Sequence, residues 1–236
     1  MKNICIVGDS WGCGEWDRVP DYGYTVTHLG IEQFLRYPPE SGAKCLVTNL
    51  SVGGSDNLSS LGRLHTALQV QTFDLVLWFI SDPLREMAYF DHESVETFGY
   101  QQLIDFNDAW LLTTLQSAEK LGQDIYCLGG STKLQKAMFD QFTKLKLYMP
   151  SVAEWLCPTY RHPRLWQSNW LKFVDTKFDL ETLDRLIFDK RLQDSLAADK
   201  RYSDFFMPDG GHPNRHGHHL LYHKIARDFN LKGETK

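Results

Sequence analysis

Three residue types that together can activate a hydroxyl group lie near the two ends of the chain. Ser10 follows an apolar run that ends on Gly8, while Asp209 and His212 stand three residues apart near the carboxyl terminus. A serine hydroxyl is a poor nucleophile until a histidine removes its proton and a carboxylate orients that histidine. The spacing of Asp209 and His212 lets the carboxylate reach Nδ1 of the imidazole and leaves Nε2 to face a hydroxyl. The three residues predict nucleophilic catalysis by Ser10.

Each of these two segments also has an ordinary structural interpretation. Asp9 and Ser10 are residue types that cap helices, and glycines 210 and 211 suit a tight loop before a final helix that starts at Pro213 and Asn214. Because both segments occur in one chain, the catalytic interpretation is favoured over the structural ones.

Short apolar runs alternate with longer amphipathic stretches along the chain. The predicted strands are residues 3–7, 44–49, 74–80 and 124–128, and the predicted helices are about 25–36, 58–71, 101–121 and 215–229. The last helix would carry Leu220, Leu221, Ile225 and Phe229 on one face. This alternation predicts an α/β fold, a three-layer α/β/α sandwich with a central parallel sheet.

Small polar loops follow all four predicted strands. They begin at Ser10, at Gly53-Gly54-Ser55, at Ser81-Asp82 and at Gly129-Gly130-Ser131. In open α/β sheets the chemistry collects at the carboxyl ends of the strands. We therefore expect these loops to lie together at one edge of the sheet.

Length and composition favour a single domain over residues 1–236, because 236 residues with 42% hydrophobic content can bury one sizeable core. From about 132 to 205 the pattern is less regular and holds several aromatic residues, among them Trp166 and Trp170. Two interpretations of this stretch stay open, an insertion that covers the site and a helical extension with aromatic core residues.

Charge and motif content narrow the partners and the compartment. A net charge of −5 and a pI near 6.0 argue against a nucleic-acid partner, whose phosphates need Lys and Arg. No signal peptide or apolar run of about 18 residues is visible, so we expect no membrane partner. The five cysteines include no CxxC pair, which favours neither a disulfide framework nor a zinc finger. We expect a cytoplasmic protein with a small-molecule substrate, and a role in a released particle stays open.

Three sequence blocks resemble the SGNH hydrolases, also called the GDSL esterase/lipase family. They are Gly8-Asp9-Ser10, Asn49-Leu50-Ser51-Val52-Gly53-Gly54, and Asp209 with His212, in the order of the family and spread over about 200 residues, with residues 130–205 unmatched. The resemblance implies the flavodoxin-like SGNH hydrolase fold and no cofactor. It implies Ser10 as nucleophile, His212 as general base and then acid, and Asp209 as the orienting carboxylate.

The resemblance also implies an oxyanion hole, and here the sequence departs from the family. The backbone N–H groups of Ser10 and Gly54 would be donors, with Gly53 in place of Gly54 if the register shifts by one. Where the family has Gly-x-Asn-Asp, this chain has Phe79-Ile80-Ser81-Asp82, so a shorter hydroxyl replaces the asparagine amide. Losing one oxyanion donor typically costs about 10²–10³ in turnover. The third oxyanion donor would then be Ser81 or, in its place, Ser55, Asn57 or Arg85.

Substrate binding is assigned to Asp82, Arg85 and Asn57. The charged stretch 82–86 is either a binding loop in which Arg85 faces an anionic substrate or a solvated turn. Pairs such as His219 and His223 have the i, i+4 spacing of metal ligands, but no HExxH pattern accompanies them, so we expect no metal. Cys13 has no base of its own, which favours a buried or rim thiol.

The sequence thus favours a serine esterase that hydrolyses an acyl ester, plausibly acetyl, of a carbohydrate or a small alcohol. The alternative is a binding or structural module with the same fold and weak or no hydrolysis, because Ser81 replaces the asparagine. Nucleotide binding at Gly129 to Thr132 is poorly supported, since no phosphate-binding glycine motif surrounds that loop. The oligomeric state is not predicted.

Overall fold

A computed structural model of the chain describes residues 1–19, 23–39, 42, 44–81, 100–158, 200–207 and 212–231. Five parallel strands form its main sheet in the order β4-β1-β5-β6-β7. Their bounds are Asn3–Gly8 (β1), Leu46–Asn49 (β4), Leu75–Ile80 (β5), Ile125–Gly129 (β6) and Leu145–Met149 (β7). Four of these strands coincide with the predicted apolar runs, and the predicted central parallel sheet is confirmed.

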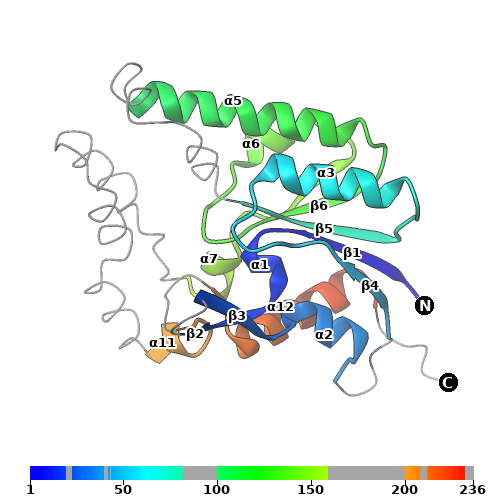
Figure 1. Cartoon of the computed structure of the whole chain (residues 1–236), viewed down its shortest axis with the longest axis vertical. Helices are drawn as coiled ribbons and strands as arrows, with labels where there is room; N and C mark the ends of the chain where they lie inside the picture. Colours follow the sequence, from blue (N-terminus) through cyan, green and yellow to red (C-terminus); the bar gives the residue numbers. More distant parts are fainter. Residues whose placement is uncertain are drawn as a thin grey trace.

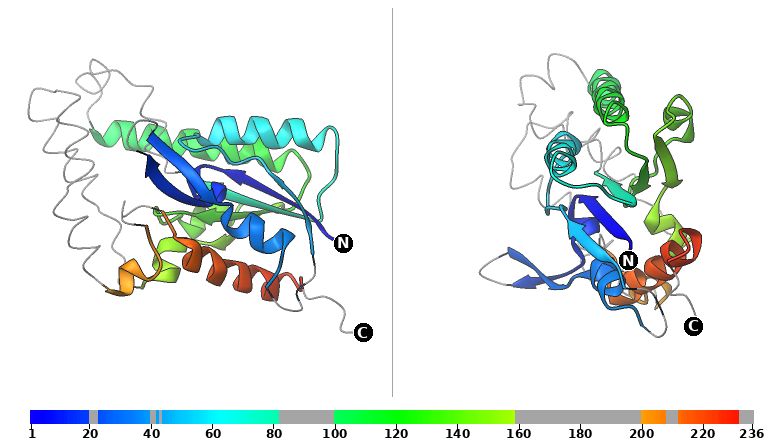
Figure 2. Two further views of the ribbon diagram at one scale, coloured as in Figure 1. Left: turned by 60° about the horizontal axis from the view of Figure 1, so that its bottom comes forward. Right: turned by 90° about the vertical axis from the view of Figure 1, so that its right-hand side faces the viewer.

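Helices cover both faces of the sheet (Figure 1 and Figure 2). On one face lie α3 (Asn57–Leu68), α5 (Tyr100–Glu119) and α6 (Lys136–Phe139), and on the other lie α2 (Gly30–Arg36), α7 (Val152–Leu156) and α12 (Arg215–Asp228). Strand β5 shows why the strands read as continuous apolar runs, because alternate side chains enter two different cores. Leu75, Leu77 and Phe79 face the α2 and α12 side, and Val76, Trp78 and Ile80 face the α3 and α5 side. The predicted three-layer sandwich is confirmed.

The predicted helices other than 25–36 agree with α3, α5 and α12. The Asp56 carboxylate caps α3 by accepting from the Ser59 N–H at 2.6 Å, and the Asn214 side chain caps α12 by accepting from the Gly217 N–H at 3.0 Å. In α12, Leu221 and Ile225 are buried, and Leu220 and Phe229 pack against the same core. The predicted apolar face of the last helix is therefore confirmed.

The helix predicted over residues 25–36 is wrong in its first part. A two-stranded antiparallel hairpin, β2 (Glu15–Val19) and β3 (Gly23–His28), precedes α2, which starts only at Gly30. Thr25, Val26 and Thr27 are β-branched and prefer strands, a local signal that the helical interpretation of the following apolar residues obscured. Strand β7 was not predicted, because it lies within the irregular stretch after residue 132.

That stretch is described only in part. Its described residues form α6, β7, α7 and the short helix α11 (Lys200–Ser203), with Trp155 38% exposed. Trp166 and Trp170 lie outside the described residues, so neither interpretation of 132–205 is tested. Within the described ranges, no helix combines the length and apolar character that crossing a membrane requires.

Candidate active site

Ser10 lies at the carboxyl edge of the sheet, where β1 turns directly into the four-residue helix α1 (Ser10–Cys13). Gly8 has a φ of +141°, and a Cβ there would lie 2.2 Å from the Phe79 carbonyl oxygen. The close approach of β1 to β5 at this position therefore requires glycine. The Asp9 side chain caps α1 by accepting from the Trp11 N–H at 3.0 Å. Asp9 is thus the helix cap that the structural interpretation proposed, and it leaves Ser10 in the first turn of the helix.

The Ser10 hydroxyl meets His212, a residue 202 positions later in the chain. Ser10 Oγ and His212 Nε2 lie 2.8 Å apart, and Ser10 is 5% exposed. The backbone at and after the histidine is held by two hydrogen bonds: Met207 N–H donates to the His212 carbonyl at 2.8 Å, and Asn214 N–H donates to the Phe205 carbonyl at 2.9 Å. The two ends of the chain therefore supply a serine and a histidine at hydrogen-bond distance.

Two indole rings lie near the His212 imidazole. The ring centroid of Trp11 lies 6.5 Å from that of His212, and the centroid of Trp16 lies 6.1 Å from it. The Trp16 indole N–H donates to the Ser10 carbonyl at 3.0 Å, and its far edge is so close to Gly53 that a Cβ on Gly53 would lie 2.6 Å from the ring. Trp16 thus contacts the backbone of both loops beside the histidine. The sequence analysis missed this role because it missed the hairpin that carries Trp16.

Gly53 and Gly54 form the turn after β4. Gly54 has a φ of +74°, a left-handed conformation that favours glycine, and a Cβ there would meet nothing within 4 Å. Within the described part of the chain, the Gly54 N–H makes no hydrogen bond. The Ser10 N–H lies in the first turn of α1, where amide groups lack an intrahelical acceptor. Both predicted oxyanion donors therefore lie at this edge of the sheet.

Cys13 is the last residue of α1, at the same end of the sheet as Ser10. Burial, together with the charges of Asp9 and Glu32, raises the pKa of the Cys13 thiol to about 12, and the Arg63 charge acts in the opposite direction. Cys13 is half-buried, and its thiol donates to the Asp9 carbonyl at 3.5 Å, in agreement with the predicted rim thiol.

Asn49, which opens the glycine-containing block, ties that block to α1. Its amide nitrogen donates to the Gly12 carbonyl at 3.0 Å, and its amide oxygen accepts from the Ser51 N–H at 3.0 Å. The loop after β4 and the helix that begins with Ser10 are therefore joined by a side chain.

Ser81 follows β5 at the same edge and is 1% exposed. Its hydroxyl donates to the Ser55 carbonyl, and the Asn57 side chain binds both backbone groups of Ser81, accepting from its N–H at 2.8 Å and donating to its carbonyl at 3.1 Å. In this arrangement Ser81 and Asn57, two of the four candidate third donors, bind backbone groups, and the hydroxyl of a third, Ser55, donates to the Asp56 carbonyl at 3.1 Å. Each of these side chains would have to leave its acceptor to reach an oxyanion, and the role of each stays a prediction.

Arg63, on α3, is a second residue that the sequence analysis missed. Its guanidinium donates to the Leu50 carbonyl at 2.8 Å, the Gly8 carbonyl at 3.3 Å and the Ser55 hydroxyl at 2.7 Å. Burial lowers the pKa of Arg63, and the Asp56 charge acts in the opposite direction. In the sequence Arg63 has no distinguishing signal, because it reads as an ordinary charged residue of an amphipathic helix.

Three predicted site residues, Asp209, Asp82 and Arg85, lie outside the described residues. The orienting carboxylate and the charged binding loop therefore stay predictions. Among the described residues, no three His, Cys, Asp or Glu side chains form a group that could hold a metal ion. His219 and His223 lie on the outer part of α12 with their Nε2 atoms 3.0 Å apart.

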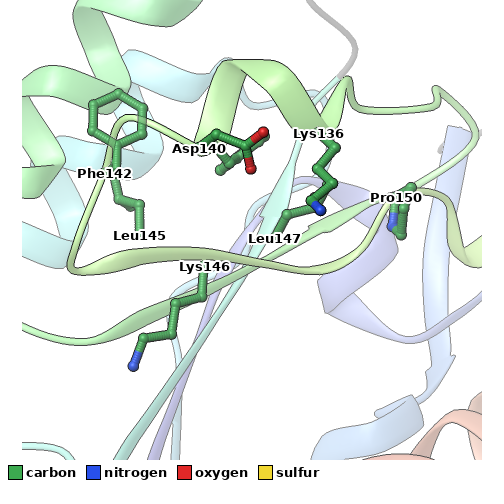
Figure 3. A pocket seen from close by; sticks show the side chains of 8 residues that line it. Lys136, Asp140, Phe142, Leu145, Lys146, Leu147 and Pro150 are labelled. Atoms are coloured by element: carbon green, nitrogen blue, oxygen red, sulfur yellow. The ribbon is translucent and has the colours of Figure 1, made fainter.

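A cavity of about 390 Å³ lies elsewhere, beside the edge strand β7 (Figure 3). Its lining comes from α6, β7 and their connections, including Lys136, Asp140 and Lys146. None of the predicted site residues lines it, so this cavity is separate from the Ser10 and His212 pair.

No family model and no curated protein sequence matches the chain. Among solved structures, the lipase/acylhydrolase from Enterococcus faecalis aligns over 100% of both chains with a TM-score of 0.50 and 15% identity. An esterase from Pseudoalteromonas (98% and 97% covered, TM-score 0.45, 14% identity) and an acetyl xylan esterase from Geobacillus stearothermophilus (100% and 97%, 0.45, 15%) also align.

The lipase/acylhydrolase alignment extends over the whole chain, and it agrees with the five-stranded parallel sheet and its two helical layers. At 15% identity this likeness establishes the fold. The expectation drawn from the three sequence blocks is confirmed at that level: the chain has the SGNH hydrolase fold, which it shares with an acylhydrolase.

Proposed function

We propose that this protein is a serine esterase in which Ser10 attacks the carbonyl carbon of an acyl ester. The observation that carries the proposal is the distance of 2.8 Å between Ser10 Oγ and His212 Nε2. A hydroxyl within hydrogen-bond reach of an imidazole is the geometry that nucleophilic activation requires. Asp209, three residues before His212, is the proposed orienting carboxylate.

The proposed reaction proceeds in two acyl-transfer steps. His212 takes the Ser10 proton as Oγ adds to the ester carbonyl, and then donates that proton to the departing alcohol, which leaves an acyl-serine. Water, deprotonated by His212, attacks the acyl-serine, and the carboxylic acid departs as Ser10 regains its proton. The N–H groups of Ser10 and Gly54 would stabilise the oxyanion of each tetrahedral intermediate.

The proposed substrate is a short acyl ester, acetyl first, of a carbohydrate or a small alcohol. Two bulky indole rings have their centroids within 6.5 Å of the His212 ring centroid, and this crowding favours a short acyl group beside Ser10. Trp16 is only half-buried and offers an apolar ring face on which the alcohol can pack.

The test is hydrolysis of p-nitrophenyl esters of increasing chain length by the wild-type protein and by Ser10→Ala. We expect turnover that is greatest for acetate and absent from the variant, together with phosphonate labelling of the wild type at Ser10, measured by peptide mass. A variant with undiminished turnover would remove Ser10 from the mechanism. If the wild type is unreactive and binds acyl carbohydrates as tightly as Ser10→Ala does, the alternative function, a binding module without hydrolysis, is favoured.

A further inference from the structure

Arg63 occupies a single point where the two loops of the proposed oxyanion hole meet. Its Nε donates to the carbonyl of Leu50, the first residue after β4, and its terminal nitrogen lies 3.3 Å from the carbonyl oxygen of Gly8, the last residue of β1. Gly8 precedes Ser10 by two residues. One rigid, planar group therefore connects the ends of two neighbouring strands.

The same guanidinium reaches the far side of the glycine turn. It donates to Ser55 Oγ at 2.7 Å and to Ser60 Oγ at 3.0 Å, and Ser55 is the residue that follows Gly54. Ser55 and Ser60 are both buried. The backbone that carries the Gly54 amide is thus held from both ends, through Leu50 before the turn and through Ser55 after it.

The hydrogen bonds of Arg63 suit a site in which backbone N–H groups must stay available to a substrate. A guanidinium has five donors and no acceptor, so it binds carbonyl and hydroxyl oxygens and leaves backbone N–H groups unused. A lysine in the same place would be a point charge without the planar fork. The loops become rigid while the Ser10 and Gly54 amides stay available.

We infer that Arg63 is a positioning residue for the oxyanion hole: it fixes the Gly54 amide relative to the Ser10 amide without itself touching substrate. This inference rests on the proposed esterase function. Displacing a reacting group by about 1 Å can cost about 10² in rate. Loss of Arg63 is therefore expected to lower kcat and to leave KM nearly unchanged.

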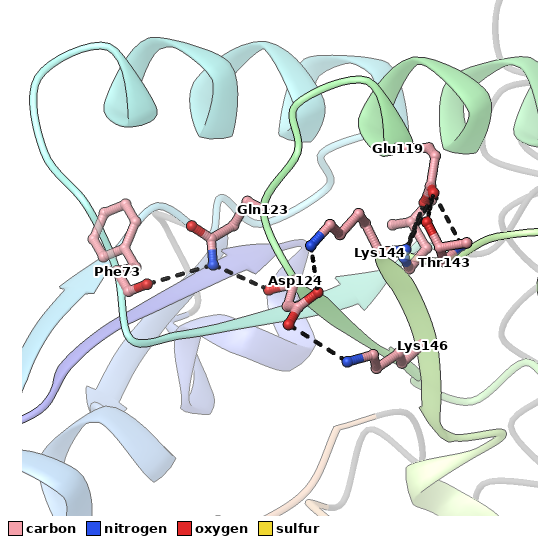
Figure 4. A network of polar contacts seen from close by, with 8 residues as sticks. Phe73, Glu119, Gln123, Asp124, Thr143, Lys144 and Lys146 are labelled. Carbon is pink, nitrogen blue, oxygen red and sulfur yellow. Dashed lines mark hydrogen bonds and ion pairs between the residues drawn. The ribbon is translucent and has the colours of Figure 1, made fainter.

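A matched control exists at the opposite end of the sheet, where the strands begin. The Glu119 carboxylate accepts from the N–H groups of Thr143, Lys144 and Leu145 at 2.9 to 3.1 Å and thereby fixes the start of β7 (Figure 4). Glu119, like Arg63, is a single charged side chain on a helix that binds several groups of a neighbouring loop. It lies at the amino end of the sheet, away from Ser10.

The experiment compares Arg63→Ala, Arg63→Lys and Glu119→Ala in the full chain. Hydrolysis of p-nitrophenyl acetate is expressed per site labelled by a phosphonate after reaction to completion, which removes any effect of a misfolded fraction. We expect kcat to fall about 100-fold in Arg63→Ala and about tenfold in Arg63→Lys, with KM within about threefold of wild type. Glu119→Ala should stay within about twofold. An unchanged kcat per labelled site in Arg63→Ala overturns the inference.

Hydrogen–deuterium exchange of residues 51–55 separates this inference from the esterase proposal, because it needs no turnover. We expect the hydrogen-bonded amides of this stretch, those of Ser51, Val52 and Ser55, to exchange at least about tenfold faster in Arg63→Ala than in wild type, and at the wild-type rate in Glu119→Ala. If the wild-type protein neither hydrolyses esters nor reacts with the phosphonate, the esterase proposal fails. Unchanged exchange in Arg63→Ala overturns the positioning role by itself.

Discussion

The two edges of the parallel sheet hold their loops with side chains of opposite charge. At the carboxyl edge the Arg63 guanidinium donates to the oxygens of Gly8, Leu50 and Ser55. At the amino edge the Glu119 carboxylate accepts from backbone N–H groups of residues 143–145 (Figure 4). A guanidinium binds carbonyl and hydroxyl oxygens and leaves backbone N–H groups for a ligand, whereas a carboxylate binds the backbone N–H groups themselves. Only the first arrangement is compatible with an oxyanion hole.

The edges also differ in how deeply their polar groups lie. Ser10, Ser55, Asn57 and Ser81 are all buried at the carboxyl edge. At the amino edge, Asp124 pairs with Lys144 and Lys146 at 3.4 and 3.5 Å through side chains that are close to half exposed. Exposed ion pairs are screened by water and contribute little to stability. Buried polar groups keep a fixed geometry, because a buried group that loses its partner costs free energy.

The largest expected difference between the edges comes from removing the proton acceptor. His212→Ala should lower kcat for p-nitrophenyl acetate by about 10³-fold or more, because Ser10 then lacks a general base. Steady-state kinetics and the melting temperature measure activity and folding separately. Turnover within tenfold of wild type in a folded variant would contradict the assignment of His212.

Two glycines with nearly the same backbone conformation, one at each end of the strands, test the difference between the two ends of the sheet. Gly54 at the carboxyl edge has a φ of +74°, Gly122 at the amino edge has a φ of +71°, and a Cβ on either would meet nothing within 4 Å. Alanine at each position should therefore cost a similar free energy of unfolding, about 1–2 kcal/mol. Only Gly54→Ala should also lower kcat, by about tenfold, because only that turn carries a proposed oxyanion donor.

Urea unfolding and kinetics on both glycine variants give the two readouts. Equal losses of activity in Gly54→Ala and Gly122→Ala would show that the effect is general strain, and the functional contrast between the edges would then be lost.

Removal of the Glu119 carboxylate should change stability alone. Burial would raise the pKa of Glu119, but hydrogen bonds from Thr143, Lys144 and Leu145 outweigh it, and the pKa is lowered. Glu119→Ala deletes these bonds, and we expect a loss of about 1–2 kcal/mol in the free energy of unfolding, measured by urea titration. A variant as stable as wild type would mean that the network of Figure 4 contributes no net stability.

The smallest expected effect concerns the dependence of stability on pH. His218 is fully buried, with its ring beside Gly30, and burial together with the charges of His28 and His212 lowers its pKa to about 4 against an opposing contribution from the Gly14 backbone. The unfolded chain therefore binds more protons than the folded chain between the ordinary histidine pKa of about 6.5 and this lowered value. Stability from His218 is present above that window and is lost as the pH falls through it, by about 1 kcal/mol between about pH 7 and pH 5.5.

Thermal melts of His218→Phe and Glu119→Gln across this range separate the two edges. The His218 variant should flatten the stability profile above about pH 4. The Glu119 variant should flatten it only below the ordinary glutamate pKa of about 4.3, because a carboxylate with a lowered pKa loses its stabilising effect on protonation there. Parallel profiles for both variants would contradict this assignment.

Local patterns were sufficient for most of the sheet. The apolar runs predicted β1, β4, β5 and β6 within two residues at each end, because a strand buried on both faces reads as a short continuous apolar segment. The β2–β3 hairpin was missed because its two strands pair only with each other, outside the main sheet, and lack the continuous apolar run that marks a strand buried on both faces. The serine, the histidine and the glycine turn were found from residue type and position, since the carboxyl ends of parallel strands share one edge.

The network around the site could not be found in this way. Arg63 reads as an ordinary charged residue of an amphipathic helix, and only its contacts with Gly8, Leu50 and Ser55 distinguish it. The Ser81 hydroxyl reads as a potential oxyanion donor, yet in the fold it donates to the Ser55 carbonyl. Hydrogen-bond partners depend on distances between segments, and those distances do not appear in residue types.

The sequence by itself therefore determined the α/β sandwich and the edge at which the chemistry would collect, because strand periodicity and loop composition are local properties. Only the tertiary structure decided that His212 Nε2 lies 2.8 Å from Ser10 Oγ, that Trp16 contacts both loops, and that Arg63 holds the backbone around Gly54. The physical reason is that each of these contacts joins residues from different elements, so it exists only when the two helical layers and the hairpin have packed around the sheet.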